Sequence, residues 1–213
     1  MLFRSVGFVA GVIGCTPDKV IVTIPTSAVQ KSLEGDVGYV TAKVTYSVID
    51  DAGKRQLAKC KAVAQKYVGD EGSVDLSGGL DPEDDNAAYL TASFKMPICT
   101  PQNIDKVGFV PPAVLWLENG QLTFKPCVKR INEELRGIDN GINVEYDGGD
   151  TIFRLVGDSD KPIQVGVFAA FLNDKPVLSV GVTIAKGTER KVLFHRTPDH
   201  IWHEINPHVS ILK

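Results

Sequence analysis

The chain has little concentrated charge of either sign. Its 23 Lys and Arg residues are nearly balanced by 26 Asp and Glu residues, which leaves a formal net charge of −3 at pH 7. The short basic clusters, such as 129–130 and 190–191, have acidic residues close by. A protein that binds nucleic acid through its phosphates needs a concentrated positive patch. The sequence therefore argues against nucleic acid as a partner.

The patterns of several catalytic and cofactor sites are also missing. The chain contains no Gly-x-Ser-x-Gly, no Cys-x-x-Cys and no glycine-rich phosphate loop that follows a strand and opens a helix. Serine hydrolases of one large class, zinc ribbons, thioredoxin-like redox proteins and many nucleotide-binding enzymes depend on these patterns. We therefore expect a protein without a cofactor, whose role is binding rather than catalysis.

The N-terminal apolar run is too short to cross a bilayer. It covers residues 6–13, begins almost at the initiator methionine and follows a single positive charge, Arg4. A spanning helix needs about 20 apolar residues, whereas the apolar part of a signal peptide needs only about 7–15. The polar residues Thr16, Pro17 and Asp18 come directly after it. This pattern predicts a signal peptide; the alternative is a short buried strand of a cytoplasmic protein.

The apolar run ends in Val12-Ile13-Gly14-Cys15, which resembles the lipobox of bacterial lipoprotein precursors. The resemblance implies that residues 1–14 are removed as a signal peptide and that Cys15 becomes an acylated N-terminus, carrying fatty acids such as palmitate. Thr16 follows the cysteine, and the absence of Asp at that position implies sorting to the outer membrane. The implied location is therefore the bacterial cell envelope, at the periplasmic or surface face, with the lipid anchor in the membrane.

Acylation of Cys15 would leave three thiols, Cys60, Cys99 and Cys127. Exported proteins fold in an oxidising compartment, where disulfides persist. Three thiols allow at most one internal bridge. Cys99 and Cys127 both lie beside prolines at the ends of expected strands, so we expect a bridge from Cys99 to either Cys60 or Cys127.

Hydrophobic periodicity predicts an α+β fold, predominantly an antiparallel β-sheet with a few short helices. The Asn119-Gly120 dipeptide favours a tight hairpin turn, and residues 173–176 predict a second one. Strands are expected over 20–24, 39–49, 88–98, 143–146 and 151–156, helices over 26–33, 54–68 and 127–135, and hairpins over 113–124 and 163–185.

The order of these elements suggests two similar α+β units. We expect an N-terminal unit over 15–100, a linker over 101–112 that is rich in Pro, Asn and Asp, and a C-terminal unit over 113–213 with a histidine-rich tail. Halves in which a helix precedes long strands are loosely similar to lipid-binding lipoproteins of the TULIP-like kind. That resemblance, which no motif carries, implies a lipid carrier.

All four histidines lie near the C-terminus, at 195, 200, 203 and 208. Imidazole is a common ligand of transition metals, so His200 and His203 are the candidate metal ligands. Pro198 and Pro207 interrupt the segment, which favours the alternative of a surface tail. The acidic runs 81–85 and 147–150 are interpreted as a solvated loop and a turn rather than as calcium sites.

Two tryptophans are candidates for the core or for a binding face. Trp116 has apolar neighbours on both sides and is expected in the core, whereas Trp202 lies among the histidines and is the candidate interface residue. The sequence therefore favours a lipid-anchored envelope protein that binds another envelope protein, the cell wall or a lipid. Plasmid- or phage-borne surface modification is one such role. The alternatives are a metal-assisted envelope enzyme that uses the histidine cluster, and the lipid carrier.

Overall fold

The computed structural model describes residues 13–15, 17–49, 51–81, 83–107, 113–126, 142–144, 150–195 and 207–212. Within these ranges the chain is mostly β-structure, with two α-helices and one turn of 3-10 helix. The helical elements are α1 (Thr26–Leu33), α2 (Asp51–Val68) and η1 (Ile104–Lys106). The strands are β1 (Ile13–Cys15), β2 (Pro17–Pro25), β3 (Gly38–Val48), β4 (Ser73–Gly78), β5 (Ala88–Cys99), β6 (Ala113–Glu118), β7 (Gln121–Pro126), β8 (Ile142–Val144), β9 (Asp150–Val156), β10 (Ile163–Leu172), β11 (Lys175–Ile184), β12 (Glu189–Phe194) and β13 (His208–Leu212).

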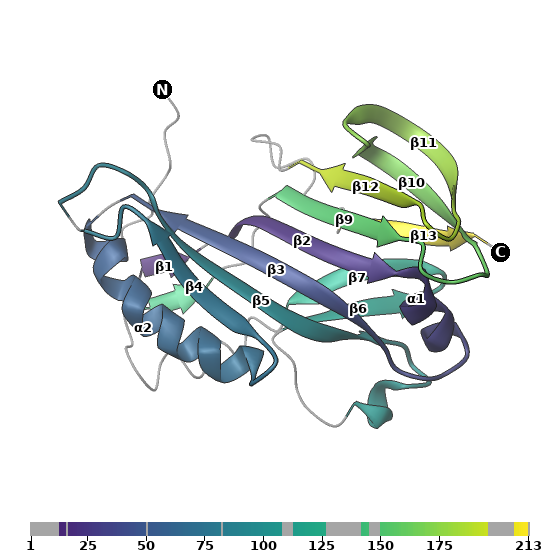
Figure 1. The fold of residues 1–213 in the computed structure, drawn as a ribbon, viewed down its shortest axis with the longest axis horizontal. Coiled ribbons are helices and arrows are strands. Elements are labelled where there is room, and N and C mark those ends of the chain that lie inside the picture. The colour runs from purple at the N-terminus through teal and green to yellow at the C-terminus, as the bar shows by residue number, and fades with distance from the viewer. Residues whose placement is uncertain are drawn as a thin grey trace.

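Nine of the strands form one closed barrel. Their order is β10-β12-β9-β2-β3-β5-β6-β7-β13, and the pairing of β13 with β10 closes the ring. β4 pairs with β5 outside the ring, and β11 pairs with the free edge of β10. Figure 1 shows β9 to β13 gathered at one end of the long axis and α2 with β4 at the other.

The predicted fold class is wrong. The structure is a mostly β closed barrel with two short α-helices and a mixed sheet, not a predominantly antiparallel sheet in two similar units; only the broad α+β class is roughly compatible with it. β2 pairs in parallel with β9, and β5 pairs in parallel with β6. β2 from the first half of the chain thus lies between β9 from the second half and β3. Alternating apolar residues identify strands but not their partners, which is why the two halves looked separate in the sequence.

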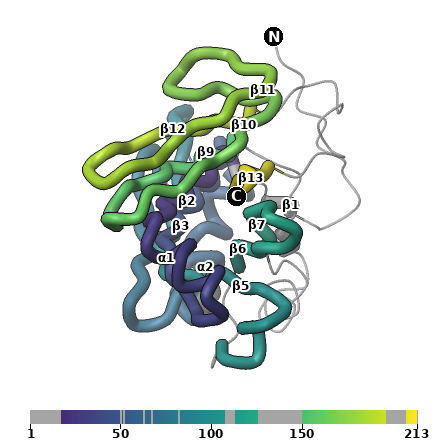
Figure 2. Tube along the Cα trace, turned by 90° about the vertical axis from the view of Figure 1, so that its right-hand side faces the viewer, coloured from purple at the N-terminus to yellow at the C-terminus, as the bar shows by residue number. Residues whose placement is uncertain are grey.

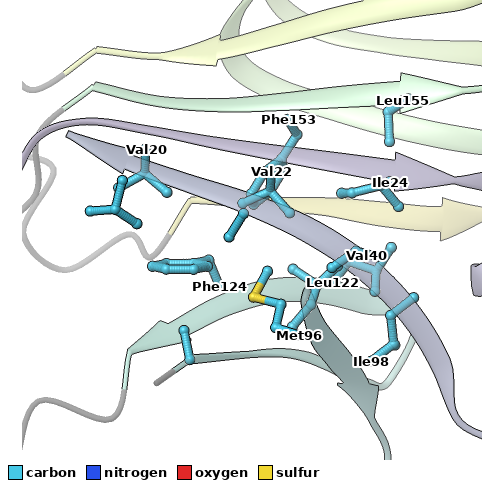
Figure 3. Close-up of a cluster of buried hydrophobic side chains, with 14 of the residues drawn as sticks. Val20, Val22, Ile24, Val40, Met96, Ile98, Leu122, Phe124, Phe153 and Leu155 are labelled. Carbon is cyan, nitrogen blue, oxygen red and sulfur yellow. The ribbon is translucent and has the colours of Figure 1, made fainter. Parts of the chain in front are cut away.

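The core lies where side chains from both halves of the chain meet inside the barrel (Figure 3). Strands that are buried on one face alternate inward apolar and outward polar residues. Along β3, for example, Val40, Ala42 and Val44 are buried while the residues between them are exposed. Ten of the side chains at the centre are labelled in Figure 3: Val20, Val22, Ile24, Val40, Met96, Ile98, Leu122, Phe124, Phe153 and Leu155.

A carboxylate from the loop after β9 caps the N-terminus of α1. The residue that precedes the helix is Pro25, which offers no side-chain cap. Asp158 Oδ1 instead accepts hydrogen bonds from the Ser27 backbone N–H at 2.8 Å and from the Thr26 hydroxyl at 3.1 Å. Its Oδ2 accepts one from the Ser27 hydroxyl at 2.5 Å. This contact joins residues that are 131 or 132 positions apart, so it fastens the helix to the second half of the barrel.

We expect Asp158→Ala to lower the free energy of unfolding by about 1–2 kcal/mol, the usual cost of losing a helix cap. Burial raises the pKa of the Asp158 carboxyl, but the hydrogen bonds from Ser27 and Thr26 outweigh it and hold the pKa below its ordinary value. A lowered pKa means that the contribution is present at neutral pH and is lost as the pH falls through that pKa. Urea unfolding at pH 7 and at pH 3 measures both effects.

The matched control is Asp160→Ala, two residues further along the same loop. Asp160 is exposed and pairs with the exposed Lys186, and such pairs contribute little. A cost at Asp158 no larger than at Asp160, or one that does not shrink at pH 3, would contradict the capping role.

A buried lysine holds the acidic loop that follows β4. Lys54, in the first turns of α2, is 5% exposed, and its ammonium donates hydrogen bonds to the backbone carbonyls of Asp81 and Asp84. The backbone N–H of Asn86 donates to the Asp84 carboxylate, and this bond is the main cause of the lowered pKa of Asp84. An internal cation thus lies beneath the acidic run 81–85, which the sequence analysis interpreted as a solvated loop.

Candidate interaction surface

The β10–β11 hairpin extends beyond the barrel and forms the candidate interaction surface. Its strands pair from Ile163 with Ile184 to Leu172 with Lys175. The turn residues Asn173 and Asp174 both have positive φ, 47° and 65°, as a tight hairpin turn requires. Figure 2 shows β11 as the outermost strand, on the far side of β10 from β12 and β9.

The hairpin carries a kink halfway along its length. The pairing skips Ala169 and Leu178, and Ala169 has a positive φ of 45°, which is costly for a residue with a side chain. In β11 both Val180 and Val177 pack against the core, so the two residues between them, Leu178 and Ser179, are both exposed. The kink therefore turns Leu178 outward, where 86% of it is exposed.

Two more exposed apolar side chains, one on β10 and one on the neighbouring strand β13, lie beside a pair of glycines in the hairpin. Gly166 lies directly opposite Gly181. A Cβ atom on Gly166 would lie 3.0 Å from the Phe168 ring and 3.4 Å from Leu212, and one on Gly181 would lie 3.6 Å from Leu212. Phe168 is 43% exposed and Leu212 is 40% exposed. We call Phe168, Leu178 and Leu212, with the glycine pair, the outer face of the hairpin.

The hairpin strand β11 has charge only at its ends. Residues 176–185 contain no Asp, Glu, Lys or Arg. At one end the exposed Asp174 pairs with Lys191 at 2.9 Å, and just past the other end Lys186 pairs with Asp160 at 2.7 Å. An exposed apolar face without interspersed charge is typical of a surface that contacts another molecule.

The structure describes only part of the candidate site residues from the sequence. Cys15 lies in β1, whose backbone pairs in parallel with β8, and β1 lies toward the opposite end of the long axis from β11 (Figure 1). His200, Trp202 and His203 lie outside the described residues. The metal site and the Trp202 interface therefore stay predictions.

The structure describes two of the four histidines, and they belong to different strands: His195 directly follows β12, and His208 is in β13. The Nδ1 atom of His195 is 3.2 Å from Asp150 Oδ1, and its imidazole meets the Phe171 ring edge-to-face at 4.9 Å. His208 opens β13 and pairs with Thr123 on β7. Across the ranges that the structure describes, no three His, Cys, Asp or Glu side chains are grouped as a metal ion requires.

Trp116 lies on the outer face of the barrel rather than in the core, which corrects the sequence interpretation. Its neighbours Leu115 and Leu117 are buried, but Trp116 itself is only half-buried. The indole N–H donates to the Glu118 carboxylate at 3.0 Å, and the Lys125 ammonium lies 5.0 Å from the ring centroid. Along a strand the inward positions alternate with outward ones, so apolar neighbours on both sides place Trp116 outside.

The structure describes two of the three cysteines named for a disulfide. Cys60 is half-buried on α2 and packs against the core, and Cys99 is buried at the end of β5. Cys127 lies outside the described residues, so a bridge from Cys99 stays a prediction.

The motifs and periodicity of the sequence did not indicate the apolar residues of the outer face. One available signal was the absence of charge over 176–185 in a strand that alternation would otherwise make half polar. The kink at Ala169 left no comparable signal, because alanine rarely adopts a positive φ.

Comparisons with protein-family models, with curated proteins and with solved structures found no match to this chain. Among the described helices, none has the length and apolar character needed to span a membrane.

Proposed function

We propose that the protein is a lipid-anchored protein of the bacterial envelope that acts as a binding module and contacts its partner through the outer face of the β10–β11 hairpin. The observation that carries the proposal is the set of exposed apolar side chains Phe168 on β10, Leu178 on β11 and Leu212 on β13, next to the uncharged stretch 176–185. Contact with another molecule would remove the apolar surface of Leu178, which is 86% exposed, from water and so favour binding at this face.

The position of the tether supports a partner away from the anchoring membrane. β1, which contains Cys15, and the hairpin lie toward opposite ends of the long axis (Figure 1). An acyl chain at Cys15 would hold the β1 end at the bilayer, since each buried methylene contributes about 0.8 kcal/mol. The hairpin would then face away from that bilayer, toward another envelope protein or the cell wall.

Processing at Cys15 would also change the small sheet of β1 and β8. Removal of residues 1–14 takes away Ile13 and Gly14, which pair with Ile142 and Asn143. Only the pair of Cys15 with Val144 would remain. The barrel does not depend on this pairing, because β2 is held by β3 and β9.

The tether is tested by the intact mass of membrane-extracted protein. We expect the wild-type chain to begin at Cys15 and to carry the mass of its acyl groups. Cys15→Ala should leave the membrane fraction almost completely, because a single substitution removes the attachment atom. A wild-type chain that keeps residues 1–14 and no lipid would overturn the envelope location.

The binding face is tested by a photoreactive amino acid placed at Leu178 in intact cells. We expect an adduct heavier than two copies of the chain, and we expect Phe168→Asp to reduce its yield about tenfold. Tyr89 on β5 is the matched control, since it is 40% exposed and its ring lies against Gly78 of the neighbouring strand β4. Two outcomes would count against the outer face. One is an adduct that forms equally well when the photoreactive residue is at position 89. The other is an adduct whose yield is unchanged by Phe168→Asp but is lost in Tyr89→Asp.

A further inference from the structure

The free edge of β11 differs from that of β4, which also extends the large sheet outside the ring. β4 has six residues, carries Asp75 in its middle and is packed against α2. β11 has ten residues, and no charge interrupts 176–185. Folded proteins protect exposed edges with short strands, charged side chains or covering helices, because an open edge pairs readily with another strand. β4 is thus short and charged and has a helix packed against it, whereas β11 has Lys175 and Pro176 at its start and no charge over 176–185.

We propose that β11 pairs antiparallel with β11 of a second copy of this chain, about a two-fold axis at Val180. Within the described residues β11 pairs with β10 alone, so its other edge has N–H and C=O groups to offer. The uncharged stretch brings no like charges together when it meets itself. A second copy is therefore a suitable occupant of this edge.

Charge complementarity selects the register. In an antiparallel pair about a two-fold axis, residues equally far from the axis lie opposite each other. Asp174 and Lys186 flank β11, and each also pairs with a charge of its own chain, Lys191 and Asp160 respectively. Both are six positions from Val180, so this axis brings Lys186 nearest to Asp174 of the partner subunit at both ends of the pair. An axis at Gly181 would instead place Lys186 opposite the uncharged Pro176 of the partner subunit.

The pairing extends the proposed function and rests on one part of it, the tether that holds both chains on the same membrane. Two chains tethered to the same membrane meet at a raised effective concentration, which favours a contact that is weak in solution. The joined hairpins would also bring two outer faces next to each other and enlarge the apolar surface offered to a partner.

Cysteine cross-linking of the full-length protein in membranes tests the pairing. Val180→Cys places a thiol on the axis, where paired Cα atoms lie about 4.5–5.5 Å apart, within the range for a disulfide. Thr183→Cys is the matched control, because its two copies would be about 20 Å apart along the strands. We expect mild oxidation to give at least about ten times more disulfide-linked dimer from Val180→Cys than from Thr183→Cys, after subtraction of the parent chain's background.

Two further variants test the edge and the register through the same readout. Ser179→Lys, at an exposed position beside the axis, brings two like charges within about 8 Å and should suppress the Val180→Cys cross-link, whereas Thr183→Lys should not. Lys186→Asp should lower the cross-link several-fold, and adding Asp174→Lys should restore it. Circular dichroism of each variant serves to check that it remains folded.

The outcomes separate this inference from the proposed function. Equal cross-linking at 180 and 183, or none at 180 in a folded protein, overturns the pairing. Phe168→Asp lies on β10, away from the free edge, and should leave the Val180→Cys cross-link intact while it removes the heavier adduct from position 178. A variant that loses the adduct but keeps the cross-link therefore has a disrupted outer face. A variant that loses only the cross-link has a disrupted pairing at the β11 edge.

Discussion

Replacing Phe153 with alanine is expected to lower the free energy of unfolding by about 3–5 kcal/mol. Phe153 is fully buried on β9, and its ring meets Phe194 of β12 edge-to-face with centroids 5.7 Å apart. β9 lies between β12 and β2, so the cavity would open where the two halves of the chain join. Urea unfolding, followed by circular dichroism and by tryptophan fluorescence, measures the loss.

The control for this substitution is Phe168→Ala on the neighbouring hairpin. Phe168 is 43% exposed, so removal of its ring should cost less than about 1 kcal/mol, as is usual for surface positions. We also expect the two probes to report one transition in Phe153→Ala, because both halves share one barrel. A cost below 1 kcal/mol at Phe153, or two transitions that each belong to half of the chain, would contradict the shared core.

Replacing Gly157 with alanine is expected to destabilise the protein by about 3 kcal/mol and to lower Tm by about 6–12 °C. A Cβ atom at this position would lie 1.8 Å from the carbonyl oxygen of Ala185, a backbone atom that cannot rotate away. Two hydrogen bonds of 2.8 Å hold the segments together, from Gly157 N–H to Thr188 and from Gly187 N–H to Gly157. The end of β9 and the turn before β12 would therefore have to separate.

Gly187→Ala, in that same turn, distinguishes steric clash from backbone conformation. Gly187 has a φ of 76°, and no atom lies within 4 Å of where its Cβ would be. Alanine there meets only the cost of a left-handed backbone, about 1 kcal/mol. Thermal unfolding by circular dichroism compares the two variants. A larger loss at 187 than at 157 would show that the close approach of Gly157 to Ala185 does not control this corner.

Most of the individual elements could be predicted from the sequence. The strand expected over 39–49 is β3, the helix expected over 54–68 lies within α2, and the strand expected over 88–98 is β5. The hairpin turn at Asn119-Gly120 is confirmed, since both residues have positive φ. These predictions succeed because periodicity and turn chemistry are local properties of the chain. The helix expected over 127–135 lies outside the described residues.

The arrangement of the elements could not be predicted in the same way. The pairing of Lys19 with Asp150 joins residues 131 positions apart, and neither strand carries a signal that names the other. The strands β12 and β13, which complete the ring, were not expected at all. The outer face was missed for a related reason: Leu178 reads as one more inward residue of an apolar strand, and only the kink at Ala169 exposes it.

The parallel pairing of β2 with β9 also has a consequence for how the chain folds. β2 is synthesised early, and its partner β9 follows more than a hundred residues later in the chain, so the two cannot pair until then. Folds dominated by such distant contacts form slowly, because loop closure costs entropy before the contacts are made. Until then the apolar residues of β2 and β3 remain open to aggregation. We therefore expect refolding from urea to be slow and to lose yield as the protein concentration rises.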